Sequence, residues 1–199
     1  MNQYFLKIMK EIEIKAKIDD IEKMRGKLLV LGCQFREPLF QEDVIFLPVG
    51  IEFSDIIKGT PVVRIRLSND KVTLTLKKKI SQGNELIKLE KEIIISDRNT
   101  AREIVKQMGF HEVIKVSKER SECGYKDMTI CLDMVEGLGT FIEVEKMSEN
   151  EDGAEVQRNL FDFLQTLGIG EREKVTKGYD TLLYEKAKKC QKMKVLIVY

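Results

Sequence analysis

The chain lacks the features that would attach it to nucleic acid, to a membrane or to zinc. Lys and Arg total 34 against 33 for Asp and Glu, so a net charge of +1 gives no overall attraction to nucleic acid or to an acidic membrane. There is one histidine, and no two of the four cysteines have the C-x-x-C spacing of a zinc site. No apolar run reaches the roughly 20 residues that span a bilayer, and none near the start resembles a signal peptide. We therefore expect a soluble, cytoplasmic protein with reduced thiols.

The chain has enough apolar sequence for one sizeable core. Of its 199 residues, 43% are hydrophobic and 34% are charged, which predicts a single domain over residues 1–187. Residues 10–35 and 91–113 share one pattern, a K-E-I-x-I strand followed by a helix that stops at glycine, which predicts duplicated halves at about 8–95 and 91–186. Residues 188–199 are expected to form a flexible or edge-docked tail.

Hydrophobic periodicity predicts an α+β fold with a predominantly antiparallel sheet. Helical stripes follow the first strand and recur at about 97–109, 151–167 and 176–187. Short, turn-like connections favour antiparallel neighbours. The predicted strands lie near 10–18, 39–47, 61–67, 71–80, 86–95, 112–121, 126–134 and 139–147. Eight antiparallel strands with this many helices tend to curl into a closed barrel with the helices packed outside.

In seven of these strands, charged and aliphatic residues alternate with a period of two. In the first strand Glu11, Glu13 and Lys15 share one face, and Ile12 and Ile14 share the other. For any single strand, an ordinary sheet with its polar face in water explains such alternation best. Across seven strands that explanation weakens, because a closed barrel would turn all the charged faces toward one tunnel.

A tunnel lined in this way would suit a polyphosphate with a divalent metal. Its charges would be costly to desolvate unless water, metal or ligand compensated them. Mg²⁺ or Mn²⁺ takes carboxylate oxygens, and E-x-E pairs place two carboxylates on one side, roughly 6.6 Å apart. Arg and Lys bind phosphoryl oxygens. The carboxylates expected on the inner face are Glu11, Glu13, Glu90, Glu92, Asp133, Glu143 and Glu145.

An ordered set of motifs over about residues 8–186 resembles the CYTH family of triphosphate tunnel metalloenzymes. The motifs are Glu11-x-Glu13-x-Lys15, Arg64-Ile65-Arg66, Leu74-Thr75-Leu76-Lys77, Glu90-Lys91-Glu92, Lys118-x-Arg120 and the stretch from Leu132 to Glu145. The resemblance implies an eight-stranded antiparallel tunnel that binds a triphosphate with Mg²⁺ or Mn²⁺.

The resemblance also implies roles for individual residues. Glu11, Glu13, Glu143 and Glu145 match metal ligands, and Glu90 and Glu92 match second-metal or ligand-orienting groups. Lys15, Lys77 and Asp133 are the candidate catalytic residues, with Asp133 positioning water or metal. The residues that match triphosphate binders are Lys15, Arg64, Arg66, Lys77, Lys118 and Arg120.

Within the family, the stretch from Gln41 to Phe46 resembles the class IV adenylyl cyclase branch, with Ile45 where an aromatic residue is usual. The expected activity is therefore conversion of ATP to cyclic AMP and pyrophosphate. Two alternatives stay open: hydrolysis of thiamine triphosphate or inorganic tripolyphosphate, and a non-catalytic module that binds polyphosphate or RNA 5′-triphosphate ends. The direction in which the triphosphate lies in the tunnel decides between cyclisation of ATP and hydrolysis. From the resemblance we also expect a homodimer.

Overall fold

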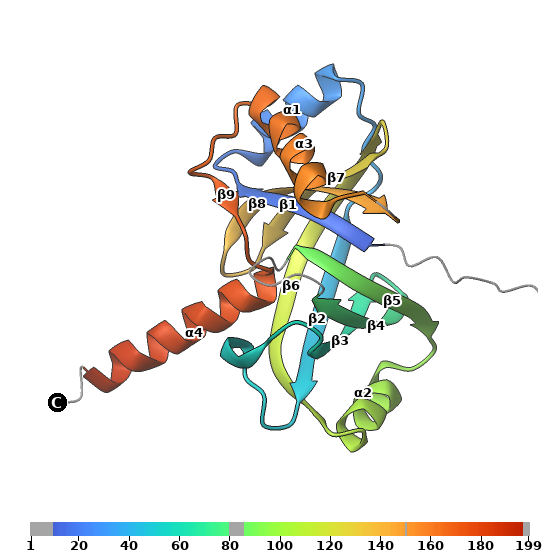
Figure 1. The fold of residues 1–199 in the computed structure, drawn as a ribbon, viewed down its shortest axis with the longest axis vertical. Coiled ribbons are helices and arrows are strands. Elements are labelled where there is room, and N and C mark those ends of the chain that lie inside the picture. The colour runs from blue at the N-terminus through green and yellow to red at the C-terminus, as the bar shows by residue number, and fades with distance from the viewer. Residues whose placement is uncertain (1–9, 80–85, 150, 197–199) are drawn as a thin grey trace, which may run out of the picture.

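Eight strands close into a ring, with helices outside it (Figure 1). The computed structural model describes residues 10–79, 86–149 and 151–196. The expectations for residues 1–9 and 197–199 lie outside these ranges. The ring consists of β1 (Lys10–Lys17), β2 (Leu39–Pro48), β3 (Pro61–Ser68), β4 (Lys71–Lys79), β5 (Ile87–Ile95), β6 (Phe110–Tyr125), β7 (Met128–Val135) and β8 (Gly139–Ser148).

Closure of the ring depends on β1. The order β5-β4-β3-β2-β6-β7-β8-β1 returns to β5, and every pairing is antiparallel. Along one edge β1 pairs with β8 over its whole length. Its other edge is divided, because β5 pairs only with Lys10–Ile12 while the short β9 (Lys174–Val175) pairs at Lys15 and Ala16. The predicted eight-stranded antiparallel barrel is confirmed.

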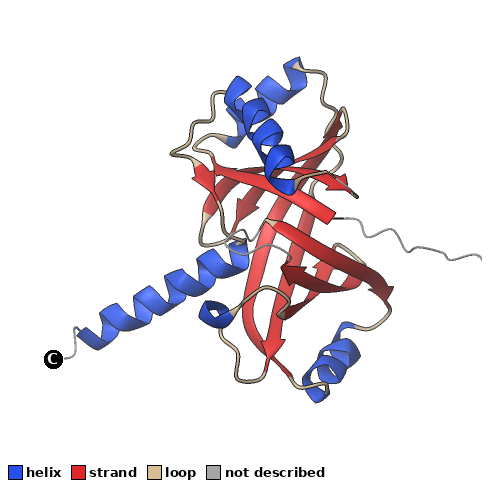
Figure 2. Cartoon of the chain, in the orientation of Figure 1, coloured by secondary structure: helices blue, strands red, loops and turns tan. Residues whose placement is uncertain are grey.

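The aliphatic faces of the strands point outward, against two groups of helices. Ile12, Ile14 and Ala16 of β1 are buried in a core with α1 and α3, at the top of Figure 2. On the other side of the barrel, α2 buries Ala101 and Val105 against β2 and β3. This burial accounts for the period-two alternation, because it leaves the charged positions facing inward. The helices are α1 (Ile21–Val30), α2 (Arg98–Gln107), α3 (Gly153–Thr166) and α4 (Tyr179–Leu196), with a 3-10 turn η1 at Phe53–Asp55.

The C-terminal segment differs from its prediction. The helix expected to end near 187 continues to Leu196, and α4 extends away from the barrel (Figure 1). The prediction that the helix ends near residue 187 is therefore wrong, and the expectation of a flexible or edge-docked tail stays a prediction. The segment contains Lys, Gln, Met and Leu but no glycine or proline, so its helix propensity is high.

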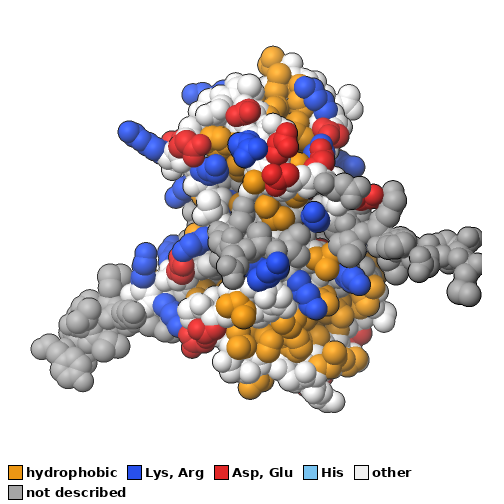
Figure 3. Space-filling model, viewed as in Figure 1, with side chains coloured by type: hydrophobic (Ala, Val, Ile, Leu, Met, Phe, Trp, Pro, Cys, Tyr) orange, Lys and Arg blue, Asp and Glu red, His pale blue; other side chains and the backbone are white. Residues whose placement is uncertain are grey.

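Part of the outer surface is apolar. Figure 3 shows hydrophobic side chains gathered on the lower part of the molecule, around β5 and α2. Exposed residues there include Ile93, Ile94, Ile104 and Met108. The expected homodimer stays a prediction. In the part of the chain that the structure describes, no helix is long and apolar enough to cross a bilayer.

Candidate functional site

The barrel encloses a cavity of about 480 Å³, and its walls are mostly ionic. Of the residues predicted for the site, all except Asp133 line this cavity. They come from six strands, which confirms that the charged faces of these strands converge. The predicted residues that line it are Glu11, Glu13, Lys15, Arg64, Arg66, Lys77, Glu90, Glu92, Lys118, Arg120, Glu143 and Glu145.

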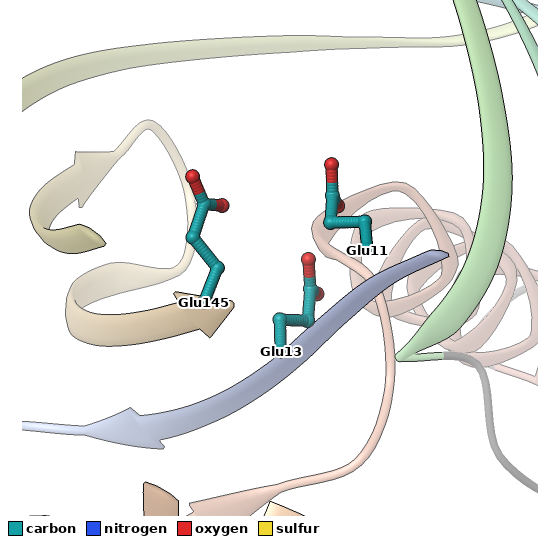
Figure 4. A group of neighbouring side chains, drawn as sticks. All are labelled: Glu11, Glu13 and Glu145. Carbon is teal, nitrogen blue, oxygen red and sulfur yellow. The ribbon is translucent and has the colours of Figure 1, made fainter. Parts of the chain in front are cut away.

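Three carboxylates meet on one wall. Glu11 and Glu13 of β1 and Glu145 of β8 point toward one another, and each offers an oxygen within 4.8 Å of the others (Figure 4). The β1–β8 register produces this group, since Glu13 lies directly opposite Glu145. Burial, together with the charge of Glu11, raises the pKa of Glu145 to about 7. Burial also raises the pKa of Glu11. Hard oxygen donors that repel one another in this way fit Mg²⁺ or Mn²⁺.

Lys88 of β5 is the cation beside this acidic group. Its Nζ lies 3.3 Å from Glu13, 3.7 Å from Glu11 and 3.9 Å from Glu90. Burial alone would raise the pKa of Glu13. The charges of Lys88 and Lys15 outweigh burial and hold this pKa below its ordinary value. Sequence reasoning gave Lys88 no role. The signal was its shared parity with Glu90 and Glu92.

Glu143 lies deeper than Glu145 and has different neighbours. Lys15 Nζ approaches Glu143 at 2.8 Å, and Arg120 also bonds to the Glu143 carboxylate. These cations outweigh the effect of burial, so the pKa of Glu143 is held well below its usual range. The structure thus places Glu143 among the cations and outside the group formed by Glu11, Glu13 and Glu145.

Asp133 lies behind the cavity wall and anchors two of the cations. It is fully buried on β7, directly opposite Arg120 of β6. The Arg120 guanidinium donates to both of its carboxylate oxygens, at 2.7 and 2.6 Å, and Lys118 Nζ donates at 3.1 Å. The Tyr179 hydroxyl at the start of α4 also donates to it. Asp133 therefore positions Lys118 and Arg120, which both line the cavity.

The opposite wall pairs a second set of cations with carboxylates. Arg64 lies 3.2 Å from Glu92 and 3.6 Å from Glu90, and Lys77 donates to Glu90 at 2.5 Å. Thr75 donates to Glu92 at 2.7 Å. Although burial opposes it, Lys77 and Lys88 lower the pKa of Glu90 to about 2. Glu90 and Glu92 thus serve in this structure as partners of cations.

Asp43 is a functional candidate that sequence reasoning missed. It accepts two hydrogen bonds from the Arg66 guanidinium, at 2.6 and 2.7 Å. Burial would raise the pKa of Asp43, but the hydrogen bonds and charge of Arg66 hold it well below the usual range. The Q-x-D pattern of Gln41 and Asp43 was visible in the sequence. The pairing with Arg66 required the β2–β3 register, which sets the two residues opposite each other.

Comparison with known proteins agrees with this geometry. The family model described as the CYTH domain matches residues 9–179. The protein named "Putative adenylate cyclase MJ0240" of Methanocaldococcus jannaschii is 34% identical over 176 residues, which cover 86% of this chain and 97% of that protein. Adenylate cyclase CyaB of Aeromonas hydrophila is 24% identical over 173 residues, 86% of this chain and 87% of that protein.

A solved structure has the same fold. The PH1819 protein of Pyrococcus horikoshii OT3 superposes with a TM-score of 0.74 at 33% identity, and the match covers 88% of this chain and 99% of that one. The family model matches most of the chain, and the structure shows both the barrel and the convergent ionic face. These observations lead to one assignment. The chain belongs to the CYTH family.

Proposed function

We propose that this chain is a metal-dependent enzyme that binds a nucleoside triphosphate inside its barrel and converts ATP to cyclic AMP and pyrophosphate. One observation carries the proposal: three carboxylates that can share a cation lie in the same cavity as cations from five strands. Polyphosphate and divalent metal together would neutralise both sets. The names of the two curated relatives support the cyclase reaction.

The residues of the chain would act by binding and orientation. Arg64, Arg66 and Arg120 offer forked donors to phosphoryl oxygens, and Lys15 and Lys118 offer point charges. Four of these cations are buried and Arg66 is 16% exposed, and burial strengthens their interaction with phosphate.

Glu11, Glu13 and Glu145 would hold the metal. Bound there, Mg²⁺ or Mn²⁺ would neutralise phosphate charge and favour ionisation of the attacking hydroxyl. Asp133 and Asp43 would keep the guanidinium groups of Arg120 and Arg66 in fixed orientations. Such preorganisation stabilises charge that develops on the leaving phosphates.

The two other activities use the same cavity. In a cyclase the ribose 3′-hydroxyl attacks the α-phosphorus, whereas in a triphosphatase water attacks the terminal phosphorus. A non-catalytic module would bind the same triphosphate and leave it intact. The reaction products distinguish the three.

The test is to incubate the purified protein with ATP, 3′-deoxy-ATP, thiamine triphosphate and tripolyphosphate, each with Mg²⁺ or Mn²⁺, and to separate the products. We expect cyclic AMP and pyrophosphate from ATP, and binding without reaction for 3′-deoxy-ATP, which lacks the nucleophile. Orthophosphate released from 3′-deoxy-ATP or tripolyphosphate as fast as ATP is consumed would identify a triphosphatase. Binding of all four without products would identify a binding module. Glu119→Gln, an exposed position on β6, is the control variant.

A further inference from the structure

Glu13 lies where one edge of β1 changes partners. Along this edge β1 pairs with β5 as far as Ile12, and from Lys15 onward it pairs with β9. Among the residues that the structure describes, no strand pairs along this edge with Glu13 or Ile14. We call these two residues the seam of β1. A residue expected to hold metal therefore lies at a position that the strand ladder supports from one side only.

The peptide groups of Glu13 face the seam. Its N–H donates to the carbonyl of Leu86, just before β5, at 3.0 Å. The N–H and C=O of a strand residue point to the same edge, so both groups of Glu13 point away from β8. Glu13 and Glu145 thus form a non-hydrogen-bonded pair, in which the side chains approach closely. The register with β8 brings the two carboxylates together, and the Glu13 backbone is held from the opposite edge.

The Glu13 carbonyl is bound by a side chain from outside the barrel. Gln157 of α3 donates to it from Nε2 at 2.8 Å. Glu13 is only 5% exposed, and a buried carbonyl without a donor is costly. At the seam a strand partner would normally supply that donor. Gln157 takes the place of the missing strand partner.

The helix that carries Gln157 is fixed on both sides of the seam. Its first residue, Gly153, approaches β5 so closely that a Cβ built there would lie 2.7 Å from Ile87 Cδ1. Further along α3, the Phe161 ring lies under Lys174 of β9, with Nζ 4.4 Å from the ring centre. Between these contacts, buried side chains of α3 pack against β1 in the core. Gln157 therefore reaches the Glu13 carbonyl from a firm support.

We infer that Gln157 is a positioning residue of the proposed metal site. By holding the Glu13 carbonyl it fixes the β1 backbone at the seam, and so sets how the Glu13 carboxylate aligns with those of Glu11 and Glu145. A small divalent cation needs its oxygen ligands in a defined arrangement. The inference rests on the proposed function and adds a residue that does not itself line the cavity.

The test removes the donor and keeps the length of the side chain. Gln157→Met deletes the bond to Glu13, and Gln165→Met, at an exposed position of the same helix, is the control. Mn²⁺ affinity, measured by electron paramagnetic resonance, should fall roughly ten-fold in Gln157→Met. Tripolyphosphate binding without metal, measured by calorimetry, should change less than about two-fold. The control should retain both affinities.

Two results with Gln157→Met would overturn the inference and leave the proposed function intact. One is a loss of folding stability with unchanged Mn²⁺ affinity, which would show that the bond to Glu13 serves only the fold. The other is an equal loss of Mn²⁺ and tripolyphosphate affinity, which would indicate a general distortion of the barrel.

Nuclear magnetic resonance on the unmodified protein gives a second measurement that depends on no variant. Titration with Mg²⁺, which is diamagnetic, should shift the resonances of the Gln157 side-chain amide and the Glu13 carbonyl carbon with one midpoint. The Gln165 side-chain amide should not shift. Unchanged Gln157 and Glu13 resonances at saturation would overturn the inference alone. If the unmodified protein binds neither Mg²⁺ nor Mn²⁺, the proposed function fails and the inference fails with it.

Discussion

The Tyr179 hydroxyl donates a hydrogen bond of 2.9 Å to Asp133, across 46 positions of sequence. The bond joins the first residue of α4 to the carboxylate that orients Arg120 and Lys118. The Tyr179 ring also lies 4.0 Å below Lys15 Nζ and contacts the edge of Phe141. Docking of α4 and orientation of the cations are therefore coupled through one side chain.

We expect Tyr179→Phe to lower the free energy of unfolding by about 1 kcal/mol, because it removes one hydrogen bond and leaves Asp133 with its two cationic partners. Urea denaturation measures this change. The control is Tyr184→Phe, whose hydroxyl bonds to exposed Glu52 and should matter less. If both variants lowered the free energy of unfolding equally, burial of the Tyr179 hydrogen bond would add nothing to its contribution to stability.

Metal binding should depend on Glu145 more than on Glu143. Glu145→Gln removes one oxygen ligand from the acidic group, so Mn²⁺ affinity should fall about ten-fold or more. Glu143→Gln should change Mn²⁺ affinity less and instead weaken tripolyphosphate binding, because Glu143 orients Lys15 and Arg120. Electron paramagnetic resonance of free Mn²⁺ provides the first measurement and calorimetry the second. A larger Mn²⁺ effect for Glu143→Gln would transfer the ligand role to that residue.

Metal affinity should rise with pH through the window set by Glu145. Burial raises its pKa in the folded protein from 4.5 to about 7, so between these values the folded state holds a proton that the unfolded chain has lost. Without metal, this group's contribution to stability is greatest below pH 4.5 and is lost as the pH rises toward 7. Because metal binding needs the ionised carboxylate, Mn²⁺ affinity should increase over the same range.

Glu145→Gln should remove most of this pH dependence, and Glu119→Gln should retain it, since Glu119 lies on the exposed face of β6. Titrations with Mn²⁺ between about pH 5 and pH 8 would test both variants. A pH-independent affinity in the unmodified protein would contradict the assignment of Glu145.

Removing Arg66 should affect binding and folding separately. Arg66→Ala removes a forked phosphate donor, which should cost about 1.5–3 kcal/mol of tripolyphosphate affinity. It also leaves Asp43 buried without its partner, which should destabilise the fold by about 3–5 kcal/mol. The double variant Asp43→Asn/Arg66→Ala should recover much of the stability and none of the affinity. Recovery of both would mean that Arg66 acts only as a partner for Asp43.

The sequence was sufficient for the barrel and for the direction of its side chains, because a strand's period of two assigns each residue to a face. The sequence was not sufficient to predict which residues each side chain contacts. Glu143 and Glu145 share parity, yet the first lies among cations and the second among carboxylates. That difference arises from the register of β8 with β1 and β7, which depends on contacts between distant segments.

Other features were missed for local reasons. The short β9 has only two residues, too few for any periodic signal, and it forms because β1 leaves part of one edge unpaired. The end of α4 was placed too early because its last turns lack an apolar stripe. The residues there have high helix propensity and include no glycine or proline that would end the helix.

The divided edge of β1 has a consequence for the order of folding during synthesis. β1 is the first of the described strands to leave the ribosome, yet β5 offers it partners only at Lys10–Ile12. Its full-length partner is β8, which ends at Ser148. Until that residue has emerged, none of these neighbours pairs with β1 beyond Ile12, and the ring closes last through its most distant contacts. During synthesis, charged side chains therefore protect the β1 edge that later pairs with β8 from pairing with other chains. These side chains are Glu11, Glu13, Lys15 and Lys17.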